Sequence, residues 1–305
     1  MSANLPFHAR FAGLDWSSDL PLDKFDAVAE AAHGAIPVTR QTSTRIAAPV
    51  RTVGRAHIAA DGARFDCDDE VSFDCHGGTA IGWVPGPAWS GRLPVSFYSS
   101  VAAITLAMRG MLPLHASTIV LQKKAWLIVG NSGAGKSTLT AEMLQAGAEL
   151  LADDLTLLTC SPQPLAWRGR PGMRLHPATC DGMAYDGRPE PTDDHRGKLL
   201  VRPTARAADT GWPVGGILVL GNAIGEQPSA GQKAIAYGSI LFRPRIVTAL
   251  PNRARIRESL LGLAQTVPMA VLPVVQHFDA QSRTDRVERT LSAIHRLAER
   301  GLKAL

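Results

Sequence analysis

Short apolar runs separated by turn residues fill the first third of the chain. Residues 56–59 form one such run, the Asp61-Gly62 pair follows it, and the Gly77-Gly78 pair marks a later turn. Runs of this length bounded by Gly and Asp are typical of β-strands joined by tight connections. The pattern predicts a small β-rich N-terminal domain over residues 1–95, and it contains no recognisable catalytic motif.

The pattern changes to alternating strand-like and helix-like segments over residues 96–305, which predicts an α/β domain. Apolar spacing predicts helices at 97–111, 137–146, 252–264 and 284–302. Short apolar runs predict strands at 115–121, 125–129, 149–152, 155–158 and 217–220. Residues 161–212 are rich in Pro, Gly, Arg and Asp, and we expect them to be irregular or to form short strands near a functional site.

One segment matches a phosphate-binding loop in full. Residues 130–137 read GNSGAGKS, which fits GxxxxGK[ST] and lies between a predicted strand and a predicted helix. Glycines let backbone N–H groups turn toward a β-phosphate, and the helix N-terminus adds partial positive charge there. We predict that ATP contacts this loop through Gly130, Asn131, Ser132, Gly133, Ala134, Gly135, Lys136, Ser137 and Thr138.

Two side chains of the loop and two acidic residues supply candidate chemistry. Lys136 would neutralise the β- and γ-phosphates, and Ser137 would offer its hydroxyl to Mg²⁺. Asp153 and Asp154 end the next predicted strand, where the magnesium-binding carboxylate of such sites usually lies. One carboxylate could hold the metal while its neighbour accepts a proton from an attacking hydroxyl.

The remaining motifs separate the large classes of P-loop protein. A GTPase needs an NKxD-type guanine motif, and none follows the loop. An ABC ATPase needs an LSGGQ-like signature and a strand ending in two acids. The stretch 229–232 (SAGQ) resembles that signature only weakly, and we interpret it as a turn. A kinase needs the loop, the acid pair and an acceptor site, all of which are compatible with this chain.

Three stretches together resemble the catalytic domain of HPr kinase/phosphorylase. They are LHASTIV at 114–120, LIVGNSGAGKS at 127–137 and LLADDL at 150–155. Residues 112–160 carry the likeness, and it looks nearest to the tailoring kinases of lasso peptide gene clusters. The stretches RPGMRLHP at 170–177 and HRGK at 195–198 are similar to that subgroup with less specificity.

The resemblance implies a fold and a set of roles. The fold would be the compact P-loop domain shared with phosphoenolpyruvate carboxykinase. Asp153 would handle the proton of the acceptor serine, Asp154 and Ser137 would contact Mg²⁺, and His115 would lie near the phosphates. Which aspartate takes which role stays open. The acceptor would be a precursor peptide, at its C-terminal serine, and the protein would form a homo-oligomer.

The chain also departs from the HPr kinases. Thr138 stands where they place Glu, and their EIRGLGI-type signature is missing, which argues against HPr as the substrate and against phosphorolysis. Glu190, Asp193 or Asp194 would then complete the metal shell. Cations would stabilise charge on the transferred phosphate, and we select Arg174 and Lys198 from the basic residues of the Pro- and Gly-rich segment, which are Arg168, Arg170, Arg174, Lys198 and Arg202.

Composition limits the kinds of partner and the cellular compartment that we expect. The chain has 305 residues, 45% of them hydrophobic, and a net charge of +5, which suits anionic ligands. Without a Lys/Arg block or an RNA-binding aromatic pattern, we expect no nucleic-acid partner. No apolar stretch is long enough to span a bilayer, no signal peptide is recognisable, and the four cysteines lack metal or disulfide spacing. We therefore expect a cytoplasmic protein without a membrane partner.

Two alternatives remain at this point. The chain could phosphorylate a small-molecule alcohol instead of a peptide. It could also be a nucleotide-binding regulatory module without transfer activity, with the β-rich N-terminal domain as its interaction surface.

Overall fold

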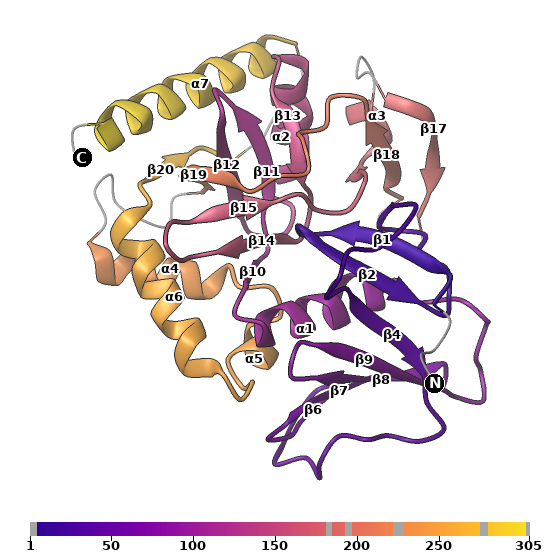
Figure 1. The fold of residues 1–305 in the computed structure, drawn as a ribbon. Helices are drawn as coiled ribbons and strands as arrows, with labels where there is room; N and C mark the ends of the chain where they lie inside the picture. Colours follow the sequence, from indigo (N-terminus) through magenta and orange to yellow (C-terminus); the bar gives the residue numbers. More distant parts are fainter. Residues whose placement is uncertain (1–4, 181–184, 193–196, 222–228, 275–279, 303–305) are drawn as a thin grey trace. The chain divides into compact units, whose positions relative to one another are not determined.

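The computed structural model describes residues 5–180, 185–192, 197–221, 229–274 and 280–302. The chain divides into two compact units, and Figure 1 labels most of its helices and strands. Unit 1 consists of Met1–Pro113 and Leu241–Ser259, and unit 2 consists of Leu114–Ile240 and Leu260–Leu305. Both units mix helices with sheets, so the structure is of the mixed α/β kind. The strand β10 (Leu112–Leu114) and the helix α6 (Arg253–Thr266) cross the division.

Unit 1 is built on one sheet with the strand order β3-β1-β2-β4-β9-β8-β7-β6-β5. Its strands are β1 (Phe7–Phe11), β2 (Leu14–Ser18), β3 (Asp26–Ala27), β4 (Ile36–Arg40), β5 (Arg51–Val53), β6 (Ala56–Ile58), β7 (Gly62–Cys67), β8 (Val71–His76) and β9 (Ala80–Pro85). Neighbours are antiparallel except that β4 pairs in parallel with both β2 and β9. The sheet agrees with the β-rich pattern of the N-terminal sequence.

Unit 1 extends beyond the predicted boundary at residue 95 because an aromatic core binds the next helical segment to it. Phe97 opens a π-helical turn, η1 (Phe97–Val101), that continues as α1 (Ala102–Met108). Its ring lies 6.5 Å from that of Trp16 and 5.3 Å from that of Phe73, centroid to centroid, and all three residues are buried. The short helix α5 (Pro244–Val247) also belongs to unit 1.

Unit 2 contains a mixed sheet with the strand order β14-β15-β19-β12-β11-β13, and β20 pairs with β19. The strands are β11 (Ser117–Leu121), β12 (Lys124–Gly130), β13 (Glu149–Ala152), β14 (Thr156–Thr159), β15 (Leu165–Trp167), β19 (Trp212–Leu220) and β20 (Met269–Leu272). The strands β12, β19 and β20 are parallel, so their carboxyl ends meet at one edge. Such an edge is where open α/β sheets bind ligands.

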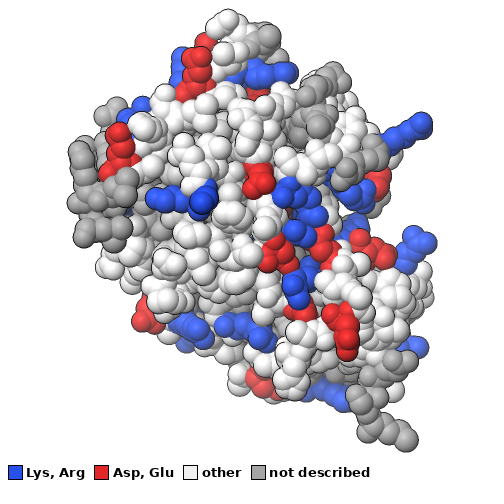
Figure 2. All heavy atoms as spheres, turned by 45° about the horizontal axis from the view of Figure 1, so that its top comes forward, with Lys and Arg blue, Asp and Glu red and all other residues white. Residues whose placement is uncertain are grey.

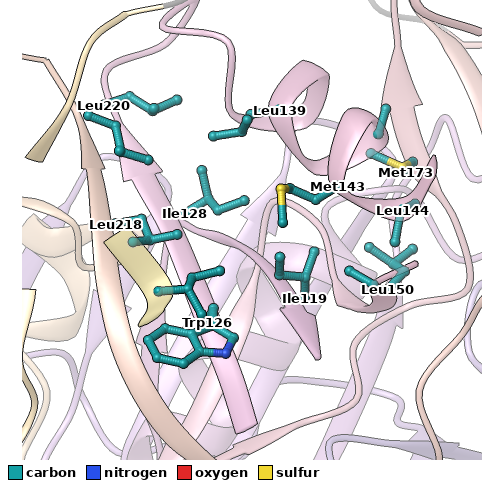
Figure 3. Packing of buried hydrophobic residues seen from close by; sticks show 14 of the residues in the cluster. Ile119, Trp126, Ile128, Leu139, Met143, Leu144, Leu150, Met173, Leu218 and Leu220 are labelled. Atoms are coloured by element: carbon teal, nitrogen blue, oxygen red, sulfur yellow. The ribbon is translucent and has the colours of Figure 1, made fainter. Parts of the chain in front are cut away.

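Two helices cover one face of this sheet and bury a common core. They are α2 (Lys136–Gln145) and α7 (Ala280–Leu302), which contact each other as well as the sheet. Trp126 and Ile128 are two residues apart on β12 and therefore face the same side, where they join Leu139 and Met143 of α2 (Figure 3). The pair Glu142–Arg286 links the two helices, and both side chains are largely buried.

The segment 161–212 forms short strands, as expected for one of the two sequence alternatives. Besides β15, these are β16 (Met173–Leu175), β17 (Tyr185–Pro191) and β18 (Leu199–Pro203), which form a separate sheet in the order β16-β18-β17, and the short helix α3 (Pro177–Cys180). The interpretation of 229–232 as a turn is wrong. Ser229 caps α4 (Ala230–Ser239) through a capping box with Gln232, so the stretch begins a helix.

Charged side chains are spread over the surface. On the face shown in Figure 2, Lys and Arg are interspersed with Asp and Glu among the described residues. The net charge of +5 is therefore not gathered into one basic field on this face. Among the helices that the structure describes, none is both long and apolar enough to cross a membrane.

Candidate active site

The loop that matches the P-loop pattern connects β12 to α2 in unit 2. It needs glycine at two positions for different reasons. Gly135 has a φ of 94° just before α2, in the left-handed region that favours glycine. At Gly130 a Cβ atom would lie 2.9 Å from the carbonyl oxygen of Leu220 on the neighbouring strand β19. The loop therefore lies against the carboxyl edge of the parallel strands.

Lys136 holds the loop together in this structure. Its Nζ donates hydrogen bonds to the carbonyl oxygens of Gly130, at 2.9 Å, and Asn131, at 3.3 Å. Burial lowers the pKa of Lys136, against the opposing effect of the carboxylates of Asp153 and Asp154. The ammonium group is thus partly desolvated and faces two acidic residues, a setting in which a polyphosphate would find a strong cationic partner.

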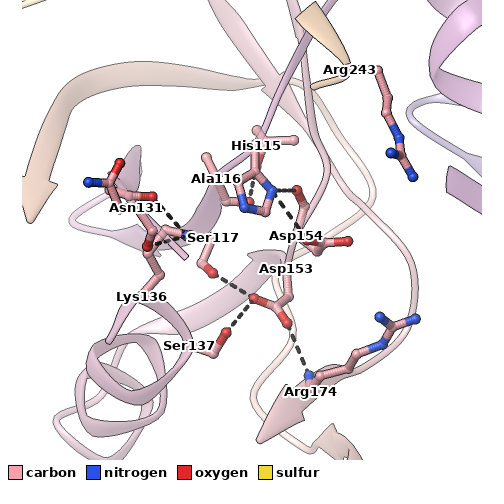
Figure 4. A network of polar contacts seen from close by, with 12 residues as sticks. His115, Ala116, Ser117, Asn131, Lys136, Ser137, Asp153, Asp154, Arg174 and Arg243 are labelled. Carbon is pink, nitrogen blue, oxygen red and sulfur yellow. Dashed lines mark hydrogen bonds and ion pairs between the residues drawn. The ribbon is translucent and has the colours of Figure 1, made fainter. Parts of the chain in front are cut away.

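Asp153 follows β13 directly and accepts three hydrogen bonds (Figure 4). Its Oδ1 accepts from the hydroxyl of Ser117 at 2.6 Å and from that of Ser137 at 3.2 Å. Its Oδ2 accepts from the backbone N–H of Arg174 at 3.0 Å. The residue is 7% exposed. Its carboxylate is therefore fixed in place next to the hydroxyl of Ser137.

Asp154 points to a different partner. Its φ of 70° is unusual for a residue other than glycine, and its Oδ1 lies 3.2 Å from Nδ1 of His115. Arg170 lies 3.9 Å from its Oδ2. Burial opposes ionisation of Asp154, but the hydrogen bond from His115 and the charges of His115, Arg170 and Arg174 outweigh it and lower the pKa to about 2. Burial in turn lowers the pKa of Arg170.

A cavity of about 300 Å³ brings these groups together. It is lined by His115, Ser117, Ser132, Gly133, Gly135, Lys136, Ser137, Thr138, Asp153, Asp154, Arg174, Leu175, His176 and Lys198. Cationic and anionic side chains share the cavity, so it can accept a polyanion and a divalent cation together. Its volume matches the lower end of the range for small-molecule sites.

Most of the residues selected from the sequence line this cavity. Three others shape the loop behind it: the carbonyl groups of Gly130 and Asn131 accept hydrogen bonds from Lys136, and Ala134 is buried in the core. Sequence reasoning missed Ser117 and gave His176 no role. Ser117 follows His115 by two residues, and the two-residue period of extended chain would have placed both side chains on one side.

Other proposed contributors lie elsewhere. The side chain of Glu190 pairs with Arg202, and that of Arg168 donates to the carbonyl of Ala207 at 3.4 Å. Asp193 and Asp194 lie outside the described residues, as does His195 of the HRGK stretch. Within the part of the chain that the structure describes, no group of three or more His, Cys, Asp or Glu side chains could hold a metal ion.

Comparison with known proteins adds little to this geometry. No protein-family model and no curated protein matches the chain. Among solved structures, the chain is similar to the Hpr(Ser) kinase/phosphatase from Coxiella burnetii, with 19% sequence identity and a TM-score of 0.25. The likeness covers 36% of this chain and 65% of the other, so the chain spans just under two thirds of that protein. A likeness of this extent carries no information on substrate or mechanism.

Proposed function

We propose that the chain is an ATP- and Mg²⁺-dependent kinase that transfers the γ-phosphoryl group to a hydroxyl. One observation carries the proposal: a single cavity joins the phosphate-binding loop, with Lys136 and Ser137, to the two carboxylates of Asp153 and Asp154. Phosphoryl transfer depends on positioning and on neutralising charge, and this cavity offers groups for both.

The oxygen atoms beside the loop fit Mg²⁺. Magnesium is usually held by one or two carboxylates together with phosphates and water, and Ser137 with Asp153 offers a hydroxyl and a carboxylate 3.2 Å apart. The family resemblance implied Ser137 and Asp154 as metal contacts and left the roles of the two aspartates open. Because Asp153 rather than Asp154 contacts Ser137, we propose Asp153 as the carboxylate ligand. When bound, Mg²⁺ would neutralise charge on the β- and γ-phosphate oxygens.

Three cations would attract the triphosphate and the transferred group. Lys136 would exchange its loop carbonyl groups for phosphate oxygens, and Arg174 and Lys198 line the same cavity. Backbone N–H groups at the N-terminus of α2 add their partial charges. Together these groups would hold the γ-phosphate in place while charge develops on its oxygens.

For the acceptor, we propose the C-terminal serine of a precursor peptide, as in lasso peptide clusters. The support is the sequence resemblance alone, and the cations of the cavity are compatible with a terminal carboxylate beside the hydroxyl. A peptide that ends in alanine is the matched control, because it keeps the carboxylate and lacks the hydroxyl.

The test has two stages. Calorimetric titration of the purified protein with ATP and MgCl₂ should show saturable binding that weakens when MgCl₂ is omitted. Mass spectrometry after incubation with ATP should then show the mass increase of one phosphoryl group on the serine-terminated peptide and none on its alanine control. Transfer to a small molecule instead would identify the other kinase alternative. Binding without any transfer would support a regulatory module, and no binding would refute the proposal.

A further inference from the structure

The contacts of Nδ1 favour one tautomer of His115. Its Nδ1 lies 3.0 Å from the backbone carbonyl oxygen of Asp154 and 3.2 Å from the carboxylate Oδ1 of the same residue. Both groups accept hydrogen bonds, which favours the tautomer in which Nδ1 carries the hydrogen. In a neutral imidazole the lone pair then lies on Nε2. The ring lines the cavity, and 37% of its side-chain surface is exposed.

Asp154 contacts the ring of His115 through both its backbone and its side chain. Its backbone adopts a left-handed conformation, which few residues other than glycine, asparagine and aspartate adopt. Asp154 offers His115 two acceptors, the backbone carbonyl oxygen and the side-chain Oδ1. The guanidinium group of Arg170 lies 3.9 Å from the other carboxylate oxygen of Asp154, Oδ2. The carboxylate of Asp154 therefore lies directly beside Nδ1 of the ring, where it can stabilise a positive charge on the imidazole.

Asp153 is differently engaged. Its two oxygens already accept from Ser117, Ser137 and the backbone of Arg174, and Ser137 belongs to the phosphate-binding loop. A carboxylate fixed in this way suits a metal ligand better than a group that must approach an incoming hydroxyl. The two neighbouring aspartates thus face different partners in the same cavity.

We propose that His115 is the proton acceptor of the transfer reaction and that Asp154 is its positioning residue. The inference rests on the proposed kinase function and deepens it. The acceptor hydroxyl oxygen forms a bond to the γ-phosphorus while the bond from that phosphorus to the β,γ-bridging oxygen breaks, and ADP leaves. The hydroxyl proton passes to Nε2 of His115, and the resulting imidazolium is paired with Asp154 until it returns the proton to water.

The first test observes the ring directly and needs no turnover. Long-range ¹H–¹⁵N spectra of the full chain with labelled histidine, assigned by the loss of one signal in His115→Gln, should show the Nδ1–H tautomer at neutral pH. In Asp154→Asn the side-chain amide can donate to Nδ1, so we expect the Nε2–H form to gain population. Asn tolerates the left-handed backbone, which preserves the fold. An Nε2–H tautomer in the unmodified protein would overturn the proposal.

The second test measures ADP formation in a single turnover, with enzyme in excess over ATP, MgCl₂ present and water as the acceptor. His115→Ala should bind Mg·ATP as the unmodified protein does and react about 10²–10⁴-fold more slowly, the usual contribution of a general base. Added imidazole should restore part of the lost rate, because it can accept the proton in place of the missing side chain. Asp154→Asn should lose less, because the backbone carbonyl still orients the ring.

His295→Ala is the matched control, since His295 also pairs with a carboxylate, that of Glu299, on α7. It should react at the normal rate. Three outcomes would overturn the proposal while leaving nucleotide binding intact: a rate in His115→Ala within threefold of normal, a loss that imidazole leaves unchanged, or Mg·ATP binding by the unmodified protein without ADP formation. Failure of Mg·ATP to bind at all would instead refute the proposed function.

Discussion

Removing the ammonium group of Lys136 offers a quantitative test of the phosphate-binding loop. In Lys136→Ala the loop loses the donor that now contacts the carbonyl oxygens of Gly130 and Asn131. The helix itself should be unaffected. Lys136 is the first residue of α2, alanine has a higher helix propensity, and a cation at a helix N-terminus opposes the dipole. The expected effect is therefore on nucleotide binding rather than on folding.

The size of the effect follows from two opposing contributions. An ammonium group about 4 Å from a phosphate oxygen gains about 4 kcal/mol at an effective dielectric constant of about 20. To reach the phosphate, Lys136 must release two hydrogen bonds to loop carbonyl groups, each of which contributes about 1 kcal/mol. The net gain is about 2 kcal/mol, which corresponds to a Kd for Mg·ATP about 30-fold higher in Lys136→Ala.

Calorimetric titration with ATP and MgCl₂ measures this directly. Lys124→Ala is the matched control, because Lys124 opens the same strand, β12, at the end away from the loop. It should bind Mg·ATP with the affinity of the unmodified protein. A Kd within threefold of normal in Lys136→Ala would refute the assignment of this ammonium group to the phosphates, whatever the turnover of that variant.

Three further predictions address the carboxylates. Asp153→Asn should raise the Mg²⁺ concentration needed for half-maximal activity and lower turnover by several orders of magnitude at fixed ATP, and an unchanged Mg²⁺ dependence in activity assays would contradict the metal assignment. The pKa of Asp154, about 2, lies below its ordinary value of 3.8, so its ionised form stabilises the fold above about pH 4, and that contribution is lost as the pH falls toward 2. Hydrogen exchange near pH 5 and pH 2.5 should show a larger loss of protection in the unmodified protein than in Asp154→Asn. Glu142→Gln removes the carboxylate that pairs with the buried Arg286 and should destabilise unit 2 by about 3–5 kcal/mol, measured by chemical denaturation. Combining Glu142→Gln with Arg286→Met should recover part of that loss.

The sequence predicted best where a motif is continuous along the chain. The loop needs a strand, eight consecutive residues and a helix, and all three lie within about 20 residues of each other. The acid pair was also accessible because it directly follows a short apolar strand. Even the helix at Ser229 was readable, since S-x-x-Q before a helix-forming segment is a capping box.

The contacts that the sequence did not predict form between residues that are far apart along the chain. Ser117 meets Asp153 only because β11 pairs with β13, and that pairing shifts register between Thr118 and Ile119. The backbone N–H of Arg174 reaches the same carboxylate across 21 residues of chain. The return of residues 241–259 to unit 1 is of the same kind, because it follows from tertiary packing and not from any local periodicity.

The acid pair shows how backbone geometry divides the work of adjacent identical residues. In an extended chain successive side chains point to opposite sides, so Asp153 and Asp154 could not both face Ser137. The chain also leaves the extended conformation at Asp154, whose positive φ turns its carboxylate and its carbonyl toward His115. Such a conformation persists only when surrounding contacts compensate for its cost, and here His115 and Arg170 supply them. The backbone conformation of Asp154, its carboxylate and the orientation of the His115 ring therefore depend on one another. Changing any one of them should alter the other two.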